Sequence, residues 1–316
     1  MRRFAEVGIH PRTRHGQNFL IDLNLLQLLA DTAQLDKRDV VLEVGTGTGS
    51  LTALLAERAA EVVSVELDSQ MHLLASEELV DVPNVTLLNQ DALRNKNHMH
   101  SVVMEHVREK LAAAPGRRFK LAANLPFNIA TPILSNLLAD DLVPMTMTAT
   151  IQKELADRII AQPSTKDYGA LSVWVQSQCE AEIVRIMSPT VFWPRPKVTS
   201  AIVHITLQPE RRAQIQNLDF FHTTLRALFF HRRKFMRSVV LSAFKGRLDK
   251  PATDQLLGRL GLGDTTRTEE LDVPTLIRLV DELRQVTAAS TEATGPDTAD
   301  SEMAGPDTGG SEQEAE

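Results

Sequence analysis

The segment LAANLPFNIAT at residues 121–131 places an Asn-Leu-Pro-Phe tetrapeptide at the end of an apolar run. An amide, a proline turn and an aromatic ring are the groups needed to hold a planar base and bind its exocyclic amine. The Asn124 side-chain oxygen and the Leu125 carbonyl are candidate acceptors that would favour the sp³ amine geometry that attacks an electrophilic methyl group. Pro126 would fix the turn, and Phe127 offers a ring face for stacking. Alone, the tetrapeptide also fits a strand end followed by a proline-broken turn.

A glycine-rich turn ends an earlier apolar run, DVVLEVGTGTG at residues 39–49, and a helix-like segment follows it. This order is typical of a buried parallel strand that opens into a helix. Gly45, Gly47 and Gly49 would let the backbone approach a nucleoside at the positive end of that helix. Ser50 stands where the dinucleotide fingerprint requires its third glycine, which disfavours a pyrophosphate-binding nicotinamide site.

Two further apolar runs are followed by a carboxylate. The run EVVSVE at 61–66 ends in Glu66, about 20 residues after the glycine turn, where an acid can bind both ribose hydroxyls. The run NVTLLNQD at 84–91 ends in Asp91, a candidate acceptor for an adenine amine. Each acid alone is more often a helix N-cap or a solvated strand end. Three such strands in this order favour a nucleoside site.

With these motifs the chain resembles the KsgA/RsmA-type rRNA adenine-N6,N6-dimethyltransferases, from about residue 12 to about residue 283. Besides the motifs above, the resemblance rests on GQNFL at 16–20, FWPRPKVTS at 192–200 and HRRK at 231–234. It implies that S-adenosylmethionine is the methyl donor, bound by Asn18, Leu20, Gly45, Glu66, Asp91 and Asn124. The commonest bacterial form of the catalytic motif has Tyr where this chain has Phe127, which keeps the stacking face and loses a hydroxyl.

The resemblance further implies direct methyl transfer to the N6 amines of two adjacent adenines in the 3′-terminal region of 16S rRNA. The substrate would be a pre-30S particle, and the enzyme a cytoplasmic monomer. One alternative is an Erm-type 23S rRNA adenine-N6 methyltransferase, which Leu125, the 192–200 loop and HRRK match less well. A second is a ribosome-assembly factor that keeps the fold as a binding module, against which the intact 124–127 motif argues.

Charge is strongly segregated along the chain, whose net charge is −7. Residues 287–316 contain eight of the 41 acids and no Lys or Arg, so this tail should be disordered, and the remainder is close to neutral. Residues 220–248 contain seven Lys or Arg and no acid, which predicts a phosphate-binding face. The alternative is an ordinary solvated surface with Phe229, Phe230, Phe235 and Leu241 packed beneath it. The candidate RNA-binding residues are Phe192, Arg195, Lys197, Arg232, Arg233 and Lys234.

The candidate aromatic in this set, Phe192, has two interpretations: a second stacking face for the extruded base, or a buried anchor of its loop. Positive charge also marks the N-terminal arm, through Arg2, Arg3, Arg12 and Arg14.

The elements expected from these patterns form an α/β fold, with a Rossmann-like seven-stranded class I methyltransferase sheet and a small C-terminal helical domain. The expected domains are 1–207 for S-adenosylmethionine binding and catalysis, 208–286 for RNA, and the tail 287–316. Expected strands lie at 39–45, 61–67, 84–90, 118–124, 145–152, 180–188 and 200–208. Expected helices lie at 22–34, 220–230, 235–244, 254–260 and 273–286.

Several classes of protein are disfavoured. No stretch approaches the roughly 20 apolar residues of a membrane span, and the N-terminus lacks the apolar core of a secretory signal. The one cysteine, Cys179, excludes an internal disulfide and suits a reducing cytoplasm. His98, His100 and His106 lack an acidic or Cys partner at ligand spacing, so we expect no metal and interpret residues 95–115 as a solvated helical insertion.

Overall fold

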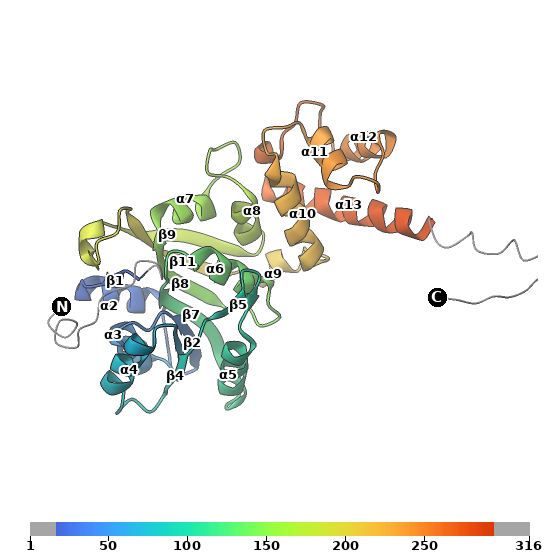
Figure 1. The fold of residues 1–316 in the computed structure, drawn as a ribbon. Helices are drawn as coiled ribbons and strands as arrows, with labels where there is room; N and C mark the ends of the chain where they lie inside the picture. Colours follow the sequence, from blue (N-terminus) through green and yellow to red (C-terminus); the bar gives the residue numbers. More distant parts are fainter. Residues whose placement is uncertain (1–16, 294–316) are drawn as a thin grey trace, which may run out of the picture.

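A seven-stranded sheet in the order β4-β3-β2-β7-β8-β11-β9 forms the centre of the larger part of the molecule (Figure 1). This computed structural model describes residues 17–293. Its strands are β2 (Asp39–Val44), β3 (Glu61–Glu66), β4 (Val85–Asn89), β7 (Arg118–Asn124), β8 (Thr146–Gln152), β9 (Cys179–Met187) and β11 (Ser200–Leu207). The first five are parallel, and β11 pairs antiparallel with β8 and β9. The expected fold class, with its hairpin at the sheet edge, is confirmed.

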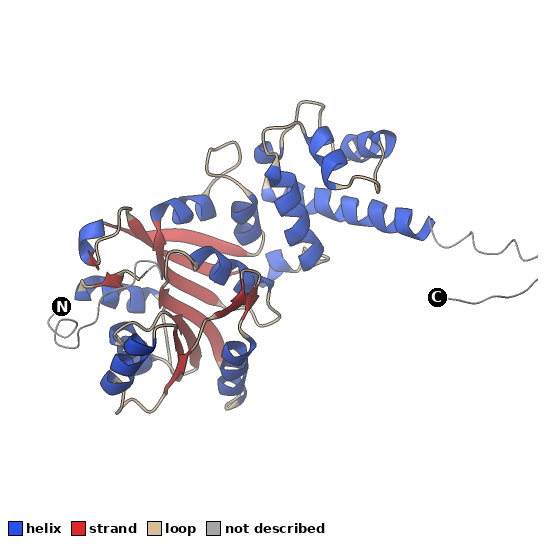
Figure 2. Cartoon of the chain, in the orientation of Figure 1, coloured by secondary structure: helices blue, strands red, loops and turns tan. Residues whose placement is uncertain are grey.

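Helices cover both faces of the sheet, as Figure 2 shows. In β2 every residue is buried, because alternate side chains enter different apolar clusters. Val41 packs in one cluster with Leu55 of α3, whereas Leu42 packs in another with Leu134 of α6. The helices of this part are α2 (Leu23–Thr32), α3 (Ser50–Arg58), α4 (Ser69–Glu78), α5 (Ser101–Ala112), α6 (Ala130–Ala139), α7 (Lys153–Ile160) and α8 (Ala170–Gln176), with a 3₁₀ turn η2 (Pro189–Val191).

The segment at 95–115 differs from its prediction as a solvated insertion. A short hairpin of β5 (Leu93–Asn95) and β6 (His98–Met99) leads into α5. Val103, Met104 and Val107 of α5 are buried in the larger cluster, so this helix covers the sheet with one apolar stripe. The polar residues on the outer face of α5 led to the prediction of a solvated segment. Within residues 17–293, no group of three His, Cys, Asp or Glu could hold a metal ion.

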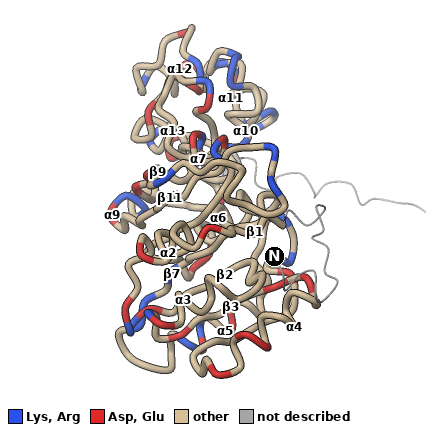
Figure 3. The backbone as a smooth tube through the Cα atoms, turned by 90° about the vertical axis from the view of Figure 1, so that its left-hand side faces the viewer, with Lys and Arg blue, Asp and Glu red and all other residues tan. Residues whose placement is uncertain are grey.

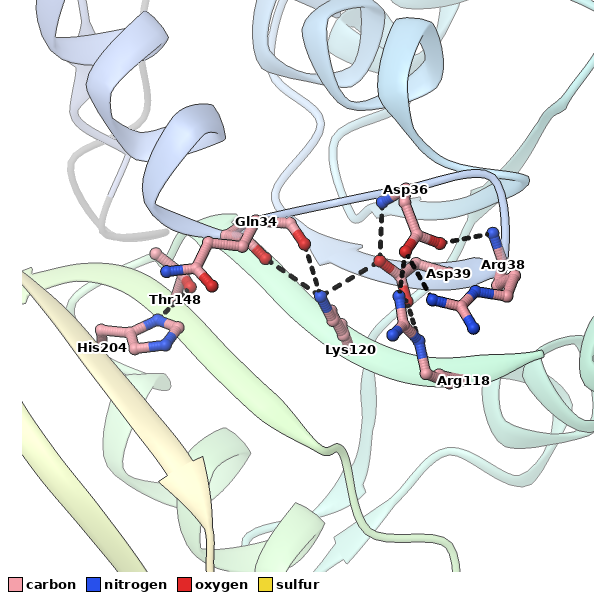
Figure 4. A network of polar contacts seen from close by, with 9 residues as sticks. Gln34, Asp36, Arg38, Asp39, Arg118, Lys120, Thr148 and His204 are labelled. Carbon is pink, nitrogen blue, oxygen red and sulfur yellow. Dashed lines mark hydrogen bonds and ion pairs between the residues drawn. The ribbon is translucent and has the colours of Figure 1, made fainter. Parts of the chain in front are cut away.

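A network of charged groups ties the amino ends of β2 and β7 to the end of α2 (Figure 4). The fully buried Asp39 carboxylate accepts from Arg118 Nε at 2.8 Å and lies 3.1 Å from Lys120 Nζ. Lys120 also donates to the Gln34 carbonyl at 2.7 Å. Because each charge is paired and hydrogen-bonded, its desolvation is compensated. The network fixes the end of the sheet opposite the glycine turn.

The helical part consists of α9 (Pro209–Arg212), α10 (Leu218–Phe230), α11 (Met236–Ala243), α12 (Lys250–Arg259), the 3₁₀ turn η3 (Thr268–Glu270) and α13 (Val273–Ala293). It shares the larger apolar cluster with the sheet. At the junction, Trp174 of α8 stacks on His222 of α10 at 4.3 Å and lies 6.3 Å from Phe221. The larger cluster therefore continues across the expected boundary at 207/208. In the described part of the chain, no helix is both long and apolar enough to cross a membrane.

The expected start of the disordered tail at residue 287 was wrong. Helix α13 continues to Ala293, and Thr287 is buried, its hydroxyl donating to the Leu283 carbonyl at 2.7 Å. Residues 275–293 contain no Gly or Pro that would end the helix, whereas Gly295 and Pro296 follow closely. The remaining tail, 294–316, lies outside the described residues, as do Gly16 and the basic N-terminal arm.

Candidate functional site

A cavity opens at the carboxyl ends of the parallel strands, where ligands bind in open α/β sheets. Phe19 and Leu67 also line it and were not predicted; Phe19 lies within the GQNFL motif, and Leu67 directly follows Glu66. The predicted residues that line it are Asn18, Gly45, Gly47, Glu66, Asp91, Asn124, Leu125 and Pro126.

The glycine turn forms one wall of this cavity in a conformation that favours glycine. Gly45 and Gly47 have φ of 90° and 57°, in the left-handed region. A Cβ on Gly47 would lie 3.1 Å from Phe19 Cε1, and one on Gly45 would lie 3.3 Å from Pro126 Cδ. The turn therefore packs against Phe19 on one side and the 124–127 tetrapeptide on the other.

Glu66, the last residue of β3, is held in place by hydrogen bonds from two backbone amides. Its Oε2 accepts from the Gly47 amide and its Oε1 from the Asp68 amide, both at 2.9 Å. Each oxygen keeps a second lone pair for another donor. Burial raises the pKa of this carboxyl, and the two amide bonds oppose that rise. The arrangement presents two fixed acceptors to a ligand with paired hydroxyls.

A second carboxyl, Glu43, lies beneath the turn and was not predicted. Its side chain is fully buried, and its Oε2 accepts from the hydroxyls of Thr52 and Ser64, both at 2.6 Å. Ser64 also bonds Thr46 of the glycine turn at 2.6 Å. Burial raises the pKa of Glu43 to about 8, so the group is protonated at neutral pH. The signal was present in the sequence, because Glu43 is the one charged residue in the otherwise apolar run VVLEV at 40–44.

Asn124, at the end of β7, combines a fixed amide with an unused acceptor. Its Nδ2 donates to the Asn18 carbonyl at 2.9 Å, which defines how the amide is oriented. Its Oδ1 is buried and has no hydrogen-bond partner among residues 17–293. A buried acceptor without a partner is costly and uncommon, and it gains when a ligand supplies a donor.

A short antiparallel pair closes the cavity next to the glycine turn. Strand β1 (Phe19–Leu20) pairs with β10 (Phe192–Trp193), and the Phe19 and Trp193 rings stack with centroids 6.3 Å apart. Leu20 does not line the cavity, because its side chain is buried in the smaller apolar cluster. The GQNFL segment thus reaches the site through Gln17, Asn18 and Phe19.

Phe192 is a buried loop anchor, which decides between its two interpretations. Only 2 % of it is exposed, and its ring packs edge-on against Phe127 with centroids 6.4 Å apart. The stacking prediction failed because pairing of β10 with β1 turns this side chain into the core. Phe192 instead supports the ring of Phe127, which itself does not line the cavity.

The predicted RNA-binding cations separate into two groups. Arg232 is committed to the fold: it donates to the Lys166 and Tyr168 carbonyls, both at 2.9 Å, and pairs with Glu269 at 3.2 Å. Its assignment to RNA is therefore corrected, because those contacts occupy its guanidinium. The other four predicted cations are exposed and have no ion pair with a described residue: Arg195, Lys197, Arg233 and Lys234. Figure 3 shows Lys and Arg positions gathered beside α10 and α11.

Comparison with known proteins gives consistent matches over most of the chain. The family model described as ribosomal RNA adenine dimethylase matches residues 9–284. Proteins named ribosomal RNA small subunit methyltransferase A are 40% identical over 272 residues in Streptococcus mutans and 39% identical over 267 in Listeria monocytogenes serotype 4a. These alignments cover 86% and 84% of this chain and 91% and 88% of the relatives.

Two solved structures are similar to this chain. A dimethyladenosine transferase from Plasmodium falciparum matches with a TM-score of 0.71 and 22% identity, covering 85% of this chain and 98% of the other. At that identity the match supports the fold alone. The 23S rRNA methyltransferase ErmE matches with a TM-score of 0.59 and 26% identity, covering 84% of this chain and 100% of the other.

Proposed function

The chain belongs to the ribosomal RNA adenine dimethylase family, and on that premise we propose that it dimethylates two adjacent adenines near the 3′ end of 16S rRNA. The methyl donor is S-adenosylmethionine, and the substrate is small-subunit rRNA in a pre-30S particle. We assign cofactor binding and chemistry to the sheet part, and RNA docking to the helices after residue 207. The observation that carries the proposal is the buried Oδ1 of Asn124, which accepts no hydrogen bond from any described residue.

The cavity residues fit this cofactor. The glycine turn allows close approach of a nucleoside, and Glu66 presents two fixed acceptors to ribose hydroxyls. Asp91 uses Oδ1 to accept from the Leu93 amide at 2.9 Å, and its exposed carboxylate has further acceptor capacity for an adenine amine. When bound, S-adenosylmethionine supplies an electrophilic methyl group on a sulfonium.

The residues of the tetrapeptide orient and polarise the target amine. Asn124 Oδ1 accepts one amine hydrogen, and the Leu125 carbonyl is the second acceptor, so the nitrogen lone pair is freed from the ring for in-line attack. The bond to the Asn18 carbonyl keeps the amide from rotating as it does so. Phe127 stacks on the extruded base, supported by Phe192. No strong general base is required, because the amine becomes acidic once it is methylated.

The comparisons favour the small subunit over the 23S alternative. The relatives at 39–40% identity are named for the small subunit, whereas ErmE is 26% identical. A pure binding module would have no use for an unpartnered acceptor at Asn124. Both alternatives therefore have less support than the proposed activity.

Methylation of purified ribosomal subunits tests the proposal. With labelled S-adenosylmethionine, unmethylated small subunits should be labelled at two neighbouring adenines, as mapped by mass spectrometry of rRNA fragments. Asn124→Ala should reduce the rate at least ~10²-fold, the scale of one lost polarising group, with cofactor affinity within a few-fold of wild type. Asn97→Ala, at an exposed position on the β5–β6 hairpin, is the matched control. Labelling of 23S rRNA, or full activity of Asn124→Ala, would contradict the proposal.

A further inference from the structure

Phe230, the last residue of α10, is the most exposed large apolar side chain among residues 17–293, at 80%. The sequence placed it beneath the basic surface, together with Phe229 and Phe235. Phe229 is partly buried, whereas Phe235 is 45% exposed. Phe230 thus stands on the basic surface instead of supporting it from below, and its contact with His231, edge-on at 4.7 Å, leaves most of the ring open.

Positive groups surround this ring. It lines a hollow of about 470 Å³ between α10 and the segment from α7 to α8, a size that accommodates a small ligand. Arg226 lies one turn before Phe230 on α10, and Arg158 of α7 lines the same hollow. Neither Arg226 nor Arg158 has an ion pair with a described residue. The lining of this hollow contains two acids, Glu154 and Asp167, and four cations, Arg158, Lys166, Arg226 and Arg232.

We propose that Phe230 stacks on an unpaired base of the rRNA substrate while Arg226 and Arg158 bind the phosphates beside it. Single-stranded RNA is bound in this way, by an exposed aromatic face next to cations. The cores of protein–protein interfaces are instead depleted of charge, and here exposed Arg233 and Lys234 follow three and four positions after the ring. This inference rests on the proposed function and adds a second RNA contact, outside the cavity that contains Asn124.

Phe230→Ala separates stacking from charge. Because one stacked base contributes about 1–3 kcal/mol, the Kd for small-subunit rRNA should rise about 5- to 150-fold. No charge is removed, so the slope of log K against log salt should stay unchanged, whereas Arg226→Ala should lower it by about one. The melting temperature of Phe230→Ala should match wild type, since the ring is exposed. Val80→Ala, at another exposed apolar position (77%), is the control.

Phe230→Trp should restore the affinity, and its extra fluorescence should be quenched by RNA, after subtraction of the wild-type signal from Trp174 and Trp193. An unchanged Kd for Phe230→Ala overturns the inference. So does a dimer in sedimentation that Phe230→Ala dissociates, because the ring would then contact a second copy. If wild type does not methylate small-subunit rRNA but Phe230→Ala still weakens RNA binding, the proposed function is refuted and the stacking of Phe230 on RNA is supported.

Discussion

Replacing Glu43 by Gln should remove a large part of the pH dependence of folding. The Gln oxygen can accept from Thr52 and Ser64 as Oε2 does now, and the amide nitrogen takes the place of Oε1, which has no partner in the described part of the chain. The shape of the network is retained, and only the titratable proton is removed. The substitution therefore tests whether a neutral acid holds the glycine turn.

The magnitude follows from the pKa. Folding raises the pKa of Glu43 from its ordinary 4.5 to about 8, so the folded protein retains a proton that the unfolded chain loses. Stability from this group is fully present below pH 4.5 and is lost as the pH rises through 8. Between pH 5 and pH 7 the loss is about 2–3 kcal/mol, at roughly 1.4 kcal/mol per unit of pKa difference. Above pH 8 the loss levels off.

Denaturant unfolding of both proteins from pH 5 to pH 9 measures this effect. The difference in unfolding free energy between Glu43→Gln and wild type should grow by about 2–3 kcal/mol between pH 5 and pH 7, in favour of the variant. Glu105→Gln removes a carboxyl from the exposed face of α5 and should follow the wild-type profile. Parallel profiles for wild type and Glu43→Gln would show that the buried group is ionised in the folded protein and would refute the reasoning.

Two further substitutions test the turn and the basic surface. Gly47→Ala places a Cβ 3.1 Å from Phe19 at a φ of 57°. The dissociation constant of S-adenosylmethionine, measured by calorimetry, should therefore rise at least ~10-fold. An unchanged affinity would show that the contact of the turn with Phe19 does not affect cofactor binding. The double variant Arg233→Ala with Lys234→Ala should lower the salt slope of rRNA binding by about two without changing the melting temperature. Arg232→Ala should instead lower the melting temperature, because the three contacts of Arg232 are lost. The reverse pattern would place Arg232 on RNA.

The sheet and much of its ligand-facing edge were predictable because buried parallel strands need continuous apolar runs, and the residues that follow them meet at one edge. Gly47, Glu66 and Asn124 were found in this way. Pairings between distant segments are not encoded in local pattern, so the pairing of β1 with β10 escaped prediction, and the sequence could not decide between the two interpretations of Phe192. Arg232 escaped for the same reason, since its partners are carbonyls far away along the chain.

The apolar cluster shared by the sheet and the helices holds the two parts of the molecule at a fixed spacing. Because Trp174 is packed between the two parts against Phe221 and His222, the spacing between Phe230 and Asn124 is set by one continuous core and by no flexible linker. An RNA would then have to present an unpaired anchoring base and a target adenine at one fixed separation. Such a molecule selects its substrate by the distance between these two bases in the folded RNA. The nucleotide sequence next to the target adenine would contribute little to the choice.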